Sequence, residues 1–170
     1  PGLAFYANAG SSFMAPAAKQ IGGTVSSPST SGELPSPGLK PESGIGRDLG
    51  MAWQPSRELA IDLRGFLNTI GDAIVSAAPS QVRSENAGSA RAMGFELDAR
   101  YSPSAHFSLF ANLTRTHTRV KDPSNPDHNG TEIPFAPAEL ANAGVSLRLP
   151  GDIHAAAYYH WVGRYYDSTS

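Results

Sequence analysis

The side chains of this chain that could take part in chemistry are charged residues on two alternating segments. Asp62 and Arg64 share one phase of the first segment, and Glu96, Asp98 and Arg100 share one phase of the second. Residues of one phase lie on one face of a β-strand, so these charges could contact a polar ligand together. They could also pair with one another across adjacent strands, and the mixture of signs favours this second interpretation.

Metal-ion chemistry is a weaker hypothesis for this sequence. His154 and His160 share a strand phase but lie about 20 Å apart at the rise of an extended strand, too far to bind one metal ion. Oxygen-bearing side chains between Asp122 and Glu132 could hold Ca²⁺, but their spacing fits no EF-hand loop and favours a solvated turn. We therefore expect no metal site. The five histidines are His106, His117, His128, His154 and His160.

Motifs of enzymes and of nucleotide-binding proteins are missing from the sequence. No GxSxG segment is present to carry a nucleophilic serine, and residues 44–50 (GIGRDLG) neither fit the GxGxxG pattern nor open a helix. The formal net charge of −2 gives no general attraction to nucleic acid. We expect no enzymatic activity, no cofactor and no nucleic-acid partner.

The composition also bounds the class of protein. The 170 residues include no cysteine, so disulfide frameworks and thiolate metal sites are excluded. No run of 18 apolar residues is present, so no transmembrane helix is expected. The chain has no initiator methionine or signal peptide, and both ends read as the middle of a strand. We therefore expect a fragment of a larger protein.

Strict alternation predicts that β-strands position the charged residues. The clearest strand lies within 86–101, where an apolar phase ending in Tyr101 alternates with a charged phase. Further strands are predicted at 3–10, 45–53, 59–75, 107–120, 140–149 and 153–166. Seven residues should share one face of the sheet, opposite the charges. These residues are Leu59, Ile61, Leu63, Phe95, Leu97, Val145 and Leu147.

The connections alternate between short and long. Short turns are predicted near 55, 103 and 151, and long loops over 17–43, 76–85 and 122–137, the first of them Ser/Gly/Pro-rich and expected to be mobile. Such a meander is typical of a transmembrane β-barrel, and aromatic residues near both strand ends agree. These aromatics are Trp53 and Tyr101 beside short turns, and Tyr159, Trp161 and Tyr165 toward a long-loop end.

Two classes of protein could use such two-faced strands. In a membrane barrel the apolar face meets lipid, so Leu63, Phe95, Leu97, Leu109 and Val145 should be exposed in the isolated chain. The alternative is a secreted or surface β-sandwich, an adhesin-like binding module. A sandwich would bury the same face against a second sheet and would usually have Greek-key connections.

Four short stretches bear on this choice. Residues 13–16 (FMAP) follow the first strand, and LKPE at 39–42 precedes DLG at 48–50. Asn86-Ala87-Gly88 precedes Ala90, Gly94 and Glu96, and Pro134 and Pro137 precede the strand at 140. In this order the stretches resemble the later barrel part of TonB-dependent outer-membrane receptors, with Met14 where the family usually has arginine. The resemblance covers most of the chain.

The resemblance implies an all-β fold, an antiparallel up-and-down meander forming a partial transmembrane barrel: about seven strands of a 22-stranded barrel. Residues 1–170 would be a fragment of the barrel domain, without the plug domain and the final strands. The implied location is the outer membrane of a Gram-negative bacterium, and the implied function is import of a ferric siderophore or similar scarce nutrient. Implied partners are the lipid bilayer, the nutrient ligand and the TonB energy-coupling protein, the last through the absent N-terminal part. Residues expected to face the lumen are Asp62, Arg64, Asn68, Glu96, Asp98, Arg100, Asn142 and Arg148.

Overall fold

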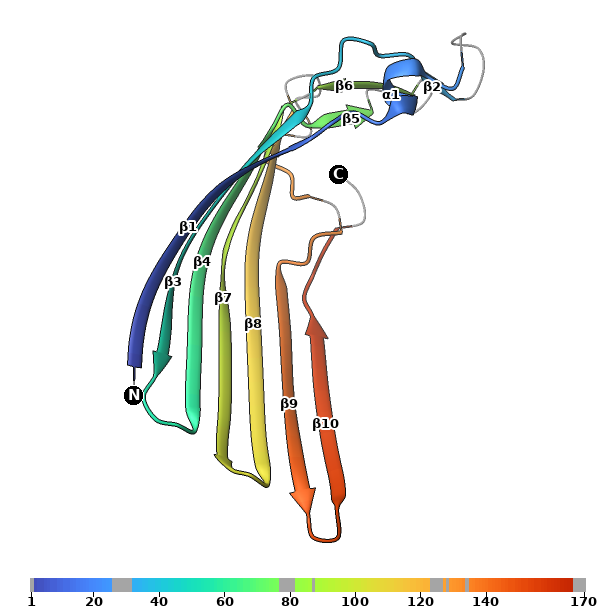
Figure 1. Ribbon diagram of the computed structural model, residues 1–170. Helices are drawn as coiled ribbons and strands as arrows, with labels where there is room; N and C mark the ends of the chain where they lie inside the picture. Colours follow the sequence, from blue (N-terminus) through green and yellow to red (C-terminus); the bar gives the residue numbers. More distant parts are fainter. Residues whose placement is uncertain are drawn as a thin grey trace.

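One antiparallel sheet of seven strands dominates the fold (Figure 1). A computed structural model describes residues 2–25, 32–76, 82–86, 88–122, 127, 129–133 and 135–166. The seven strands pair in chain order, which confirms the predicted meander. They are β1 (Gly2–Met14), β3 (Glu42–Gln54), β4 (Leu59–Gly71), β7 (Ser89–Ser104), β8 (Phe107–Lys121), β9 (Glu139–Leu149) and β10 (Ile153–Val162).

The short connections all lie at one end of the sheet, as predicted (Figure 1). They span 55–58, 105–106 and 150–152. The predicted turn near 103 begins slightly later, because β7 runs on to Ser104 through a register shift after Tyr101. In the last turn Gly151 and Asp152 both have positive φ, of 77° and 56°, as a tight reversal requires.

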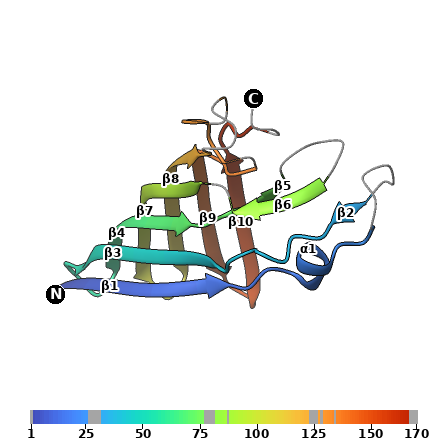
Figure 2. The same cartoon turned by 90° about the horizontal axis from the view of Figure 1, so that it is seen from above.

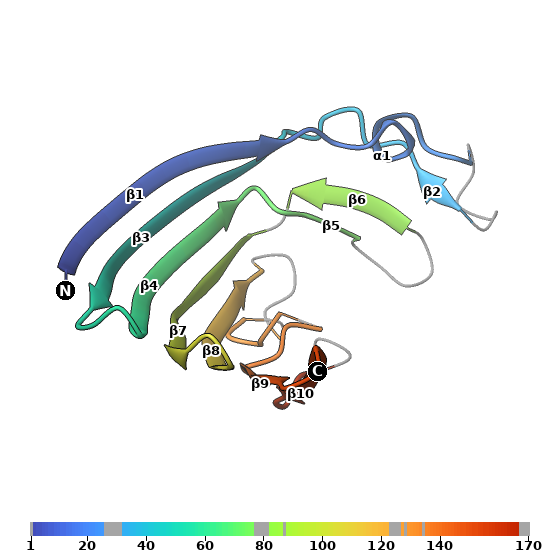
Figure 3. The same ribbon diagram turned by 60° about the horizontal axis from the view of Figure 1, so that its bottom comes forward.

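The sheet is curved and open, with β1 and β10 at its edges (Figure 3). Five of its strands have 13 to 16 residues, more than the roughly 9–11 that cross a bilayer. The long strands therefore extend beyond a membrane-sized span.

A small second sheet lies at the long-loop end, where long loops alone were predicted (Figure 2). It has the order β2 (Glu33–Leu34), β6 (Val82–Asn86), β5 (Ile74–Ser76), and helix α1 (Ala18–Gly22) lies beside it. The described part of 17–43 therefore contains a short helix and a short strand, where a loop alone was predicted. Residues 26–31 and 77–81 of the predicted loops lie outside the described part of the chain.

The predicted strand over 59–75 is broken, because Asp72 has a φ of 54° and turns the chain between β4 and β5. The side chain of Asn86 then holds three loop segments together. Its amide nitrogen donates to the carbonyls of Lys40 (2.9 Å) and Asp72 (2.7 Å), and its oxygen accepts from the Lys40 amide (2.7 Å). These bonds satisfy backbone groups that no strand pairs.

The large sheet has two chemically different faces, and neither is covered by a second layer in the described part of the chain. Directly opposed residues of antiparallel strands share a face, and the register places all seven predicted apolar residues together. Among the described residues Leu34, in the small sheet, is the single buried apolar side chain. The accessible surface is 11260 Å², against about 8000 Å² for a compact monomer of this length.

The exposure of the apolar face largely follows the barrel prediction. Leu63, Phe95 and Leu109 are 41%, 38% and 43% exposed. Leu97 and Val145 are half-buried, where exposure was predicted. No helix among the described residues is both long and apolar enough to cross a membrane. The sandwich alternative is wrong for this fold: the strands form a meander, and no sheet packs against the apolar face of the described strands.

Candidate functional site

The candidate site is the polar face of the large sheet. The register places the eight residues predicted for the lumen on this one face. Asp62 and Arg64 lie opposite Asp98 and Glu96, and Asn142 lies opposite Asn112. Further opposed pairs on this face are Gly46 with Asn68, Arg100 with Phe110 and Arg148 with His154.

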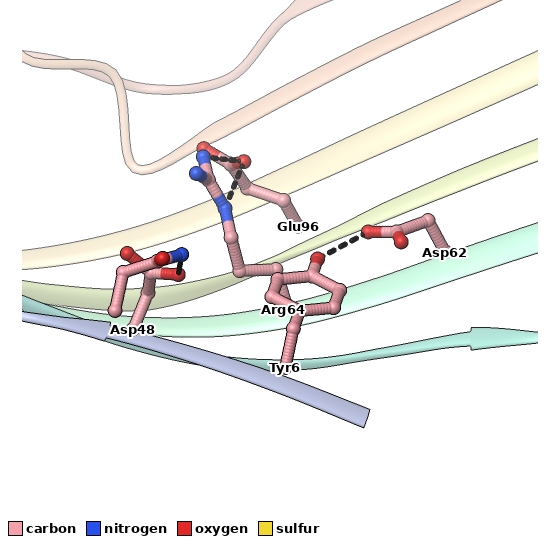
Figure 4. A network of polar contacts seen from close by, with 6 residues as sticks. Tyr6, Asp48, Asp62, Arg64 and Glu96 are labelled. Carbon is pink, nitrogen blue, oxygen red and sulfur yellow. Dashed lines mark hydrogen bonds and ion pairs between the residues drawn. The ribbon is translucent and has the colours of Figure 1, made fainter. Parts of the chain in front are cut away.

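Arg64 and Glu96 form an ion pair at the centre of this face (Figure 4). The Arg64 Nε donates to Glu96 Oε2 at 3.0 Å, and a terminal nitrogen of the same guanidinium donates to the same oxygen. The two side chains are 41% and 31% exposed. The pair confirms the predicted cross-strand neutralisation at this position.

Tyr6 makes a separate hydrogen bond near this pair, and this bond spans three strands (Figure 4). Its hydroxyl donates to Asp62 Oδ1 at 2.7 Å, although Tyr6 lies on β1, Asp62 on β4, and β3 runs between them. The ring crosses β3 at Gly50, the residue opposite Tyr6, where any added Cβ would overlap the ring. Glycine at position 50 is therefore required by the close approach of the ring.

Asn8 and Asp48 add a second polar contact beside Tyr6 (Figure 4). The Asn8 Nδ2 donates to Asp48 Oδ1 at 2.9 Å, between directly opposed residues of β1 and β3. Sequence reasoning missed Tyr6, Asn8 and Asp48 as members of the polar face. The signal was present for two of them, because Tyr6 and Asn8 alternate with the apolar Leu3 and Phe5.

The predicted ladder of opposite charges is wrong at the next position. Asp62 lies opposite Asp98, a pair of like charges that is unfavourable in a sheet. The Tyr6 hydroxyl supplies the donor that Asp62 would otherwise lack. Like charges meet here because each strand places an aspartate two residues from its own member of the Arg64–Glu96 pair. Asp62 precedes Arg64 on β4, and Asp98 follows Glu96 on the antiparallel β7.

The remaining predicted residues are spread over the face. Asn142 Oδ1 lies within hydrogen-bond distance of His160 Nδ1 on β10. Phe110 packs near Tyr158 with ring centroids 6.1 Å apart, over Gly144, and so repeats the aromatic-over-glycine arrangement of β1 to β4. Within the described part, the side chains of Asn68, Arg100 and Arg148 have no hydrogen-bonding side-chain partner. Of the eight predicted residues, the structure joins Arg64 and Glu96 directly, whereas Asp62 is bound by Tyr6.

No three His, Cys, Asp or Glu side chains come together as a metal site among the residues that the structure describes. The oxygen-rich segment considered for Ca²⁺ runs from Asp122 to Glu132, and 123–126 and 128 lie outside the described residues. The expectation of no metal site and no cofactor therefore stays an expectation.

Comparisons with solved structures give the fold a context. The copper transporter OprC matches with a TM-score of 0.69 and 22% identity, covering 94% of this chain and 23% of the transporter. The ferric-catecholate import receptor Fiu from K12 E. coli matches with a TM-score of 0.68 and 16% identity, covering 95% of this chain and 22% of the receptor. The ferric yersiniabactin uptake receptor FyuA from Yersinia pestis matches with a TM-score of 0.64 and 21% identity, covering 76% and 20%.

At these low identities the structural matches show a shared fold alone, and the chain spans 20% to 23% of the length of these proteins. No curated protein matches the sequence significantly. The family model for TonB dependent receptor-like β-barrels matches residues 1–170, the whole chain. That family consists of receptors and transporters of the Gram-negative outer membrane. The chain, with its one open antiparallel sheet of seven strands, belongs to the TonB-dependent receptor β-barrel family.

Proposed function

We propose that this chain is part of the barrel wall of an outer-membrane receptor that imports a ferric siderophore or a similar scarce metal chelate. The observation that carries the proposal is the two-faced single sheet. Its apolar face has no protein partner in the described chain, and its polar face carries a hydrogen-bonded network. A lipid bilayer outside and a wet lumen inside are the two solvents that suit these faces.

On this proposal the eight predicted residues from Asp62 to Arg148 face the lumen. Arg64 pairs with Glu96 and Asp62 accepts a hydrogen bond from Tyr6, so these side chains act as a rigid polar lining. Asn68, Arg100 and Asp98 are exposed on the same face without hydrogen-bonding side-chain partners in the described part. They are better placed to contact a passing ligand or the plug domain.

The fold supports a fragment of a larger barrel. Both edges of the sheet, at β1 and β10, carry unpaired backbone groups along one side within the described chain. Such edges are stable in a bilayer only when further strands close the sheet. We therefore propose that residues 1–170 belong to a larger barrel domain, and that a plug domain and a TonB-contacting segment lie elsewhere in the full protein.

Cysteine accessibility in the full-length receptor tests the orientation of the faces. The chain has no native cysteine, so Leu97→Cys and Asp98→Cys give adjacent, matched probes. In membranes, a small water-soluble maleimide should label position 98 and leave position 97 largely unlabelled. A lipid-soluble maleimide should show the same preference, because a thiol that faces lipid stays protonated and the thiolate is the form that reacts. Equal labelling of both positions by both reagents would contradict the proposed orientation.

Uptake assays test the ligand class. Cells with the full-length receptor should accumulate radiolabelled iron from a ferric siderophore, and a protonophore that removes the inner-membrane energy supply should stop it. A panel of ferric catecholate, ferric hydroxamate and copper chelates separates iron import from copper import. Import of none of them, with the receptor present in the outer membrane, would contradict the proposed nutrient class.

A further inference from the structure

A pocket on the polar face lies at the end of the sheet that carries the short turns (Figure 1). Small side chains line its middle: Ser108 on β8, Ser146 directly opposite on β9, and Ala156 opposite Ser146 on β10. Arg148 and His154 border the pocket one step nearer the turns. Its volume of about 420 Å³ is within the range of pockets that hold small ligands.

The larger side chains around this pocket are hydrogen-bond donors. Arg148 lies directly opposite His154, and the backbone amide of Arg148 donates to the carbonyl of His106 at 2.8 Å, which brings the turn residue His106 to the same pocket. Among the described residues, none of these three side chains takes part in a side-chain hydrogen bond or ion pair. An arginine has donors only, and a histidine ring always has at least one. The pocket therefore presents several donors that no carboxylate of the described chain occupies.

The other half of the same end of the sheet has a different character. There a second hollow of the polar face, between β1 and β7, is bordered by Asp62 and Asp98, with Arg100 beside them. The two aspartates lie directly opposite one another and would repel an anion. An excess of cationic donors is therefore a local property of the pocket at β8, β9 and β10, and not of the whole polar face.

We propose that the pocket bordered by Arg148, His154 and His106 binds a multivalent oxyanion, whose clustered carboxylate or phosphate oxygens accept from these donors. An arginine can donate two parallel hydrogen bonds to either group. The hydroxyls of Ser108 and Ser146 add donors that can rotate toward the bound oxygens.

The source of the anion follows from the direction in which the pocket lies, and this step rests on the proposed function. Short turns of outer-membrane barrels face the periplasm. The ligand is therefore either a free oxyanion of the periplasm or an anionic metal chelate that leaves the barrel on this side. Both sources present the same clustered oxygens to Arg148.

Other classes of small ligand suit the pocket less well. Arg148 repels a metal cation, and none of the described lining residues supplies the carboxylate that a hard cation prefers. An apolar ligand would remove the donors of Arg148 and His154 from water without giving them an acceptor, which is costly.

Isothermal titration calorimetry of the full-length receptor in detergent tests the proposal. The probes are citrate, inorganic phosphate, ferric citrate and trimethyl citrate, the last a neutral ester with the skeleton of citrate. Citrate and phosphate should bind, and trimethyl citrate should not. Tighter binding of ferric citrate than of the metal-free anions identifies a leaving chelate as the source, and the reverse order identifies a free periplasmic anion.

Substitutions at the rim assign the binding to this pocket. Arg148→Gln should weaken the binding of citrate and of phosphate about 10-fold, because a charge-assisted hydrogen bond is lost. His154→Phe keeps a ring and removes its N–H donor, so it should weaken the same binding about threefold. The matched control is Arg57→Gln, which removes the same charge from an exposed residue of another short turn and should leave the binding unchanged.

Adjacent alanines of β10 test the pocket by size alone. Ala156→Leu places a larger side chain in the pocket and should weaken the binding of citrate without any change of charge. Ala157→Leu makes the same enlargement one residue further, on the opposite face of the sheet, and should have no effect on this binding.

Several results would overturn the inference. These are no binding of citrate or phosphate, equal binding of citrate and its neutral ester, equal weakening by Arg57→Gln and Arg148→Gln, or equal effects of Ala156→Leu and Ala157→Leu. Heat-modified mobility on gels verifies in each case that the barrel is folded. Failure of cysteine labelling to distinguish positions 97 and 98 overturns the proposed function itself, so the two failures are distinguishable.

Discussion

The two faces of the seven-stranded sheet differ in how far their side chains are satisfied within the chain. On the polar face, the Tyr6 hydroxyl donates to Asp62 and the Arg64 guanidinium donates to Glu96, so two pairs satisfy polar groups on β1, β4 and β7. On the apolar face, Leu63 and Phe95 are exposed and have nothing from the described chain above them. The polar face is largely complete within the chain, whereas the apolar face depends on the solvent around it.

The largest expected effect breaks this comparison directly. Leu97→Arg on the apolar face should cost about 2–4 kcal/mol in the lipid-embedded barrel, because a charge near mid-height must leave water. Asp98→Arg, one residue further on the polar face, should change the stability by no more than about 1 kcal/mol and should not lower it, since it places an exposed opposite charge across from Asp62. Urea unfolding of the full-length receptor in lipid vesicles measures both. Equal losses would show that the apolar face does not meet lipid.

A smaller effect concerns the close packing of the polar face. Gly50→Val should destabilise the barrel by about 1–3 kcal/mol, because its side chain would displace the Tyr6 ring and break the bond to Asp62. The same substitution combined with Tyr6→Ala should cost less than the sum of the two single changes, as a double-mutant cycle would measure. Gly10→Val on β1 is the control, since a Cβ there meets no atom within 4 Å. If the two losses of stability simply added, Gly50→Val would not act through the Tyr6 ring.

A third effect sharpens the estimate of what the network contributes. Arg64→Gln should lower the free energy of unfolding by about 0–1 kcal/mol, because both members of the pair are partly exposed and water screens them. In a cycle with Glu96→Gln, the coupling should fall as salt is raised from 50 mM to 500 mM. A coupling independent of salt would show that this part of the polar face is shielded from water.

The smallest effect comes from a turn that belongs to neither face. Two hydrogen bonds lower the pKa of Glu58 below its ordinary value of 4.5. The larger effect comes from the Ser56 side chain, and the smaller one comes from the backbone amide of Glu58 itself. Because the folded-state pKa is the lower one, this carboxylate stabilises the turn above about pH 4.5, and the contribution disappears as the pH falls through the folded pKa. An NMR titration of the receptor, with the glutamate side-chain carboxyl carbons isotope-labelled, should show a higher pKa for Glu58 in the Ser56→Ala variant. An unchanged pKa would rule out the hydroxyl as its cause.

Much of the sheet was predictable because its physical causes are local. Alternation assigned Leu97 and Glu96 to opposite faces, and Pro- and Gly-containing segments located the short turns. The pattern does not fix which residues of neighbouring strands meet. For this reason the sequence predicted pairing of opposite charges across strands, as Arg64 and Glu96 show, but it did not predict that Asp62 would lie opposite Asp98.

The missed features depend on contacts between distant segments. Tyr6 reaches Asp62 across 56 positions, and β2 is a two-residue strand whose parallel partner β6 begins at Val82. Neither feature has a period or a turn motif that a sequence can display. The strand register places the eight polar residues on a common face. The medium that this face contacts is not a property of the sheet itself, so their lumen-facing role remains a prediction.

The meander also has a kinetic consequence. Strands β7 and β8 are joined by two residues, whereas β1 and β3 are separated by residues 15–41. Each doubling of a flexible loop adds about 0.6 kcal/mol to the entropy cost of closing it, so the β1–β3 pairing starts from a disadvantage of about 2 kcal/mol. Short hairpins should therefore form first, as separate units. The long-range pairings then join these units, and the Asn86 amide, which bridges three loop segments, can be completed only after that step.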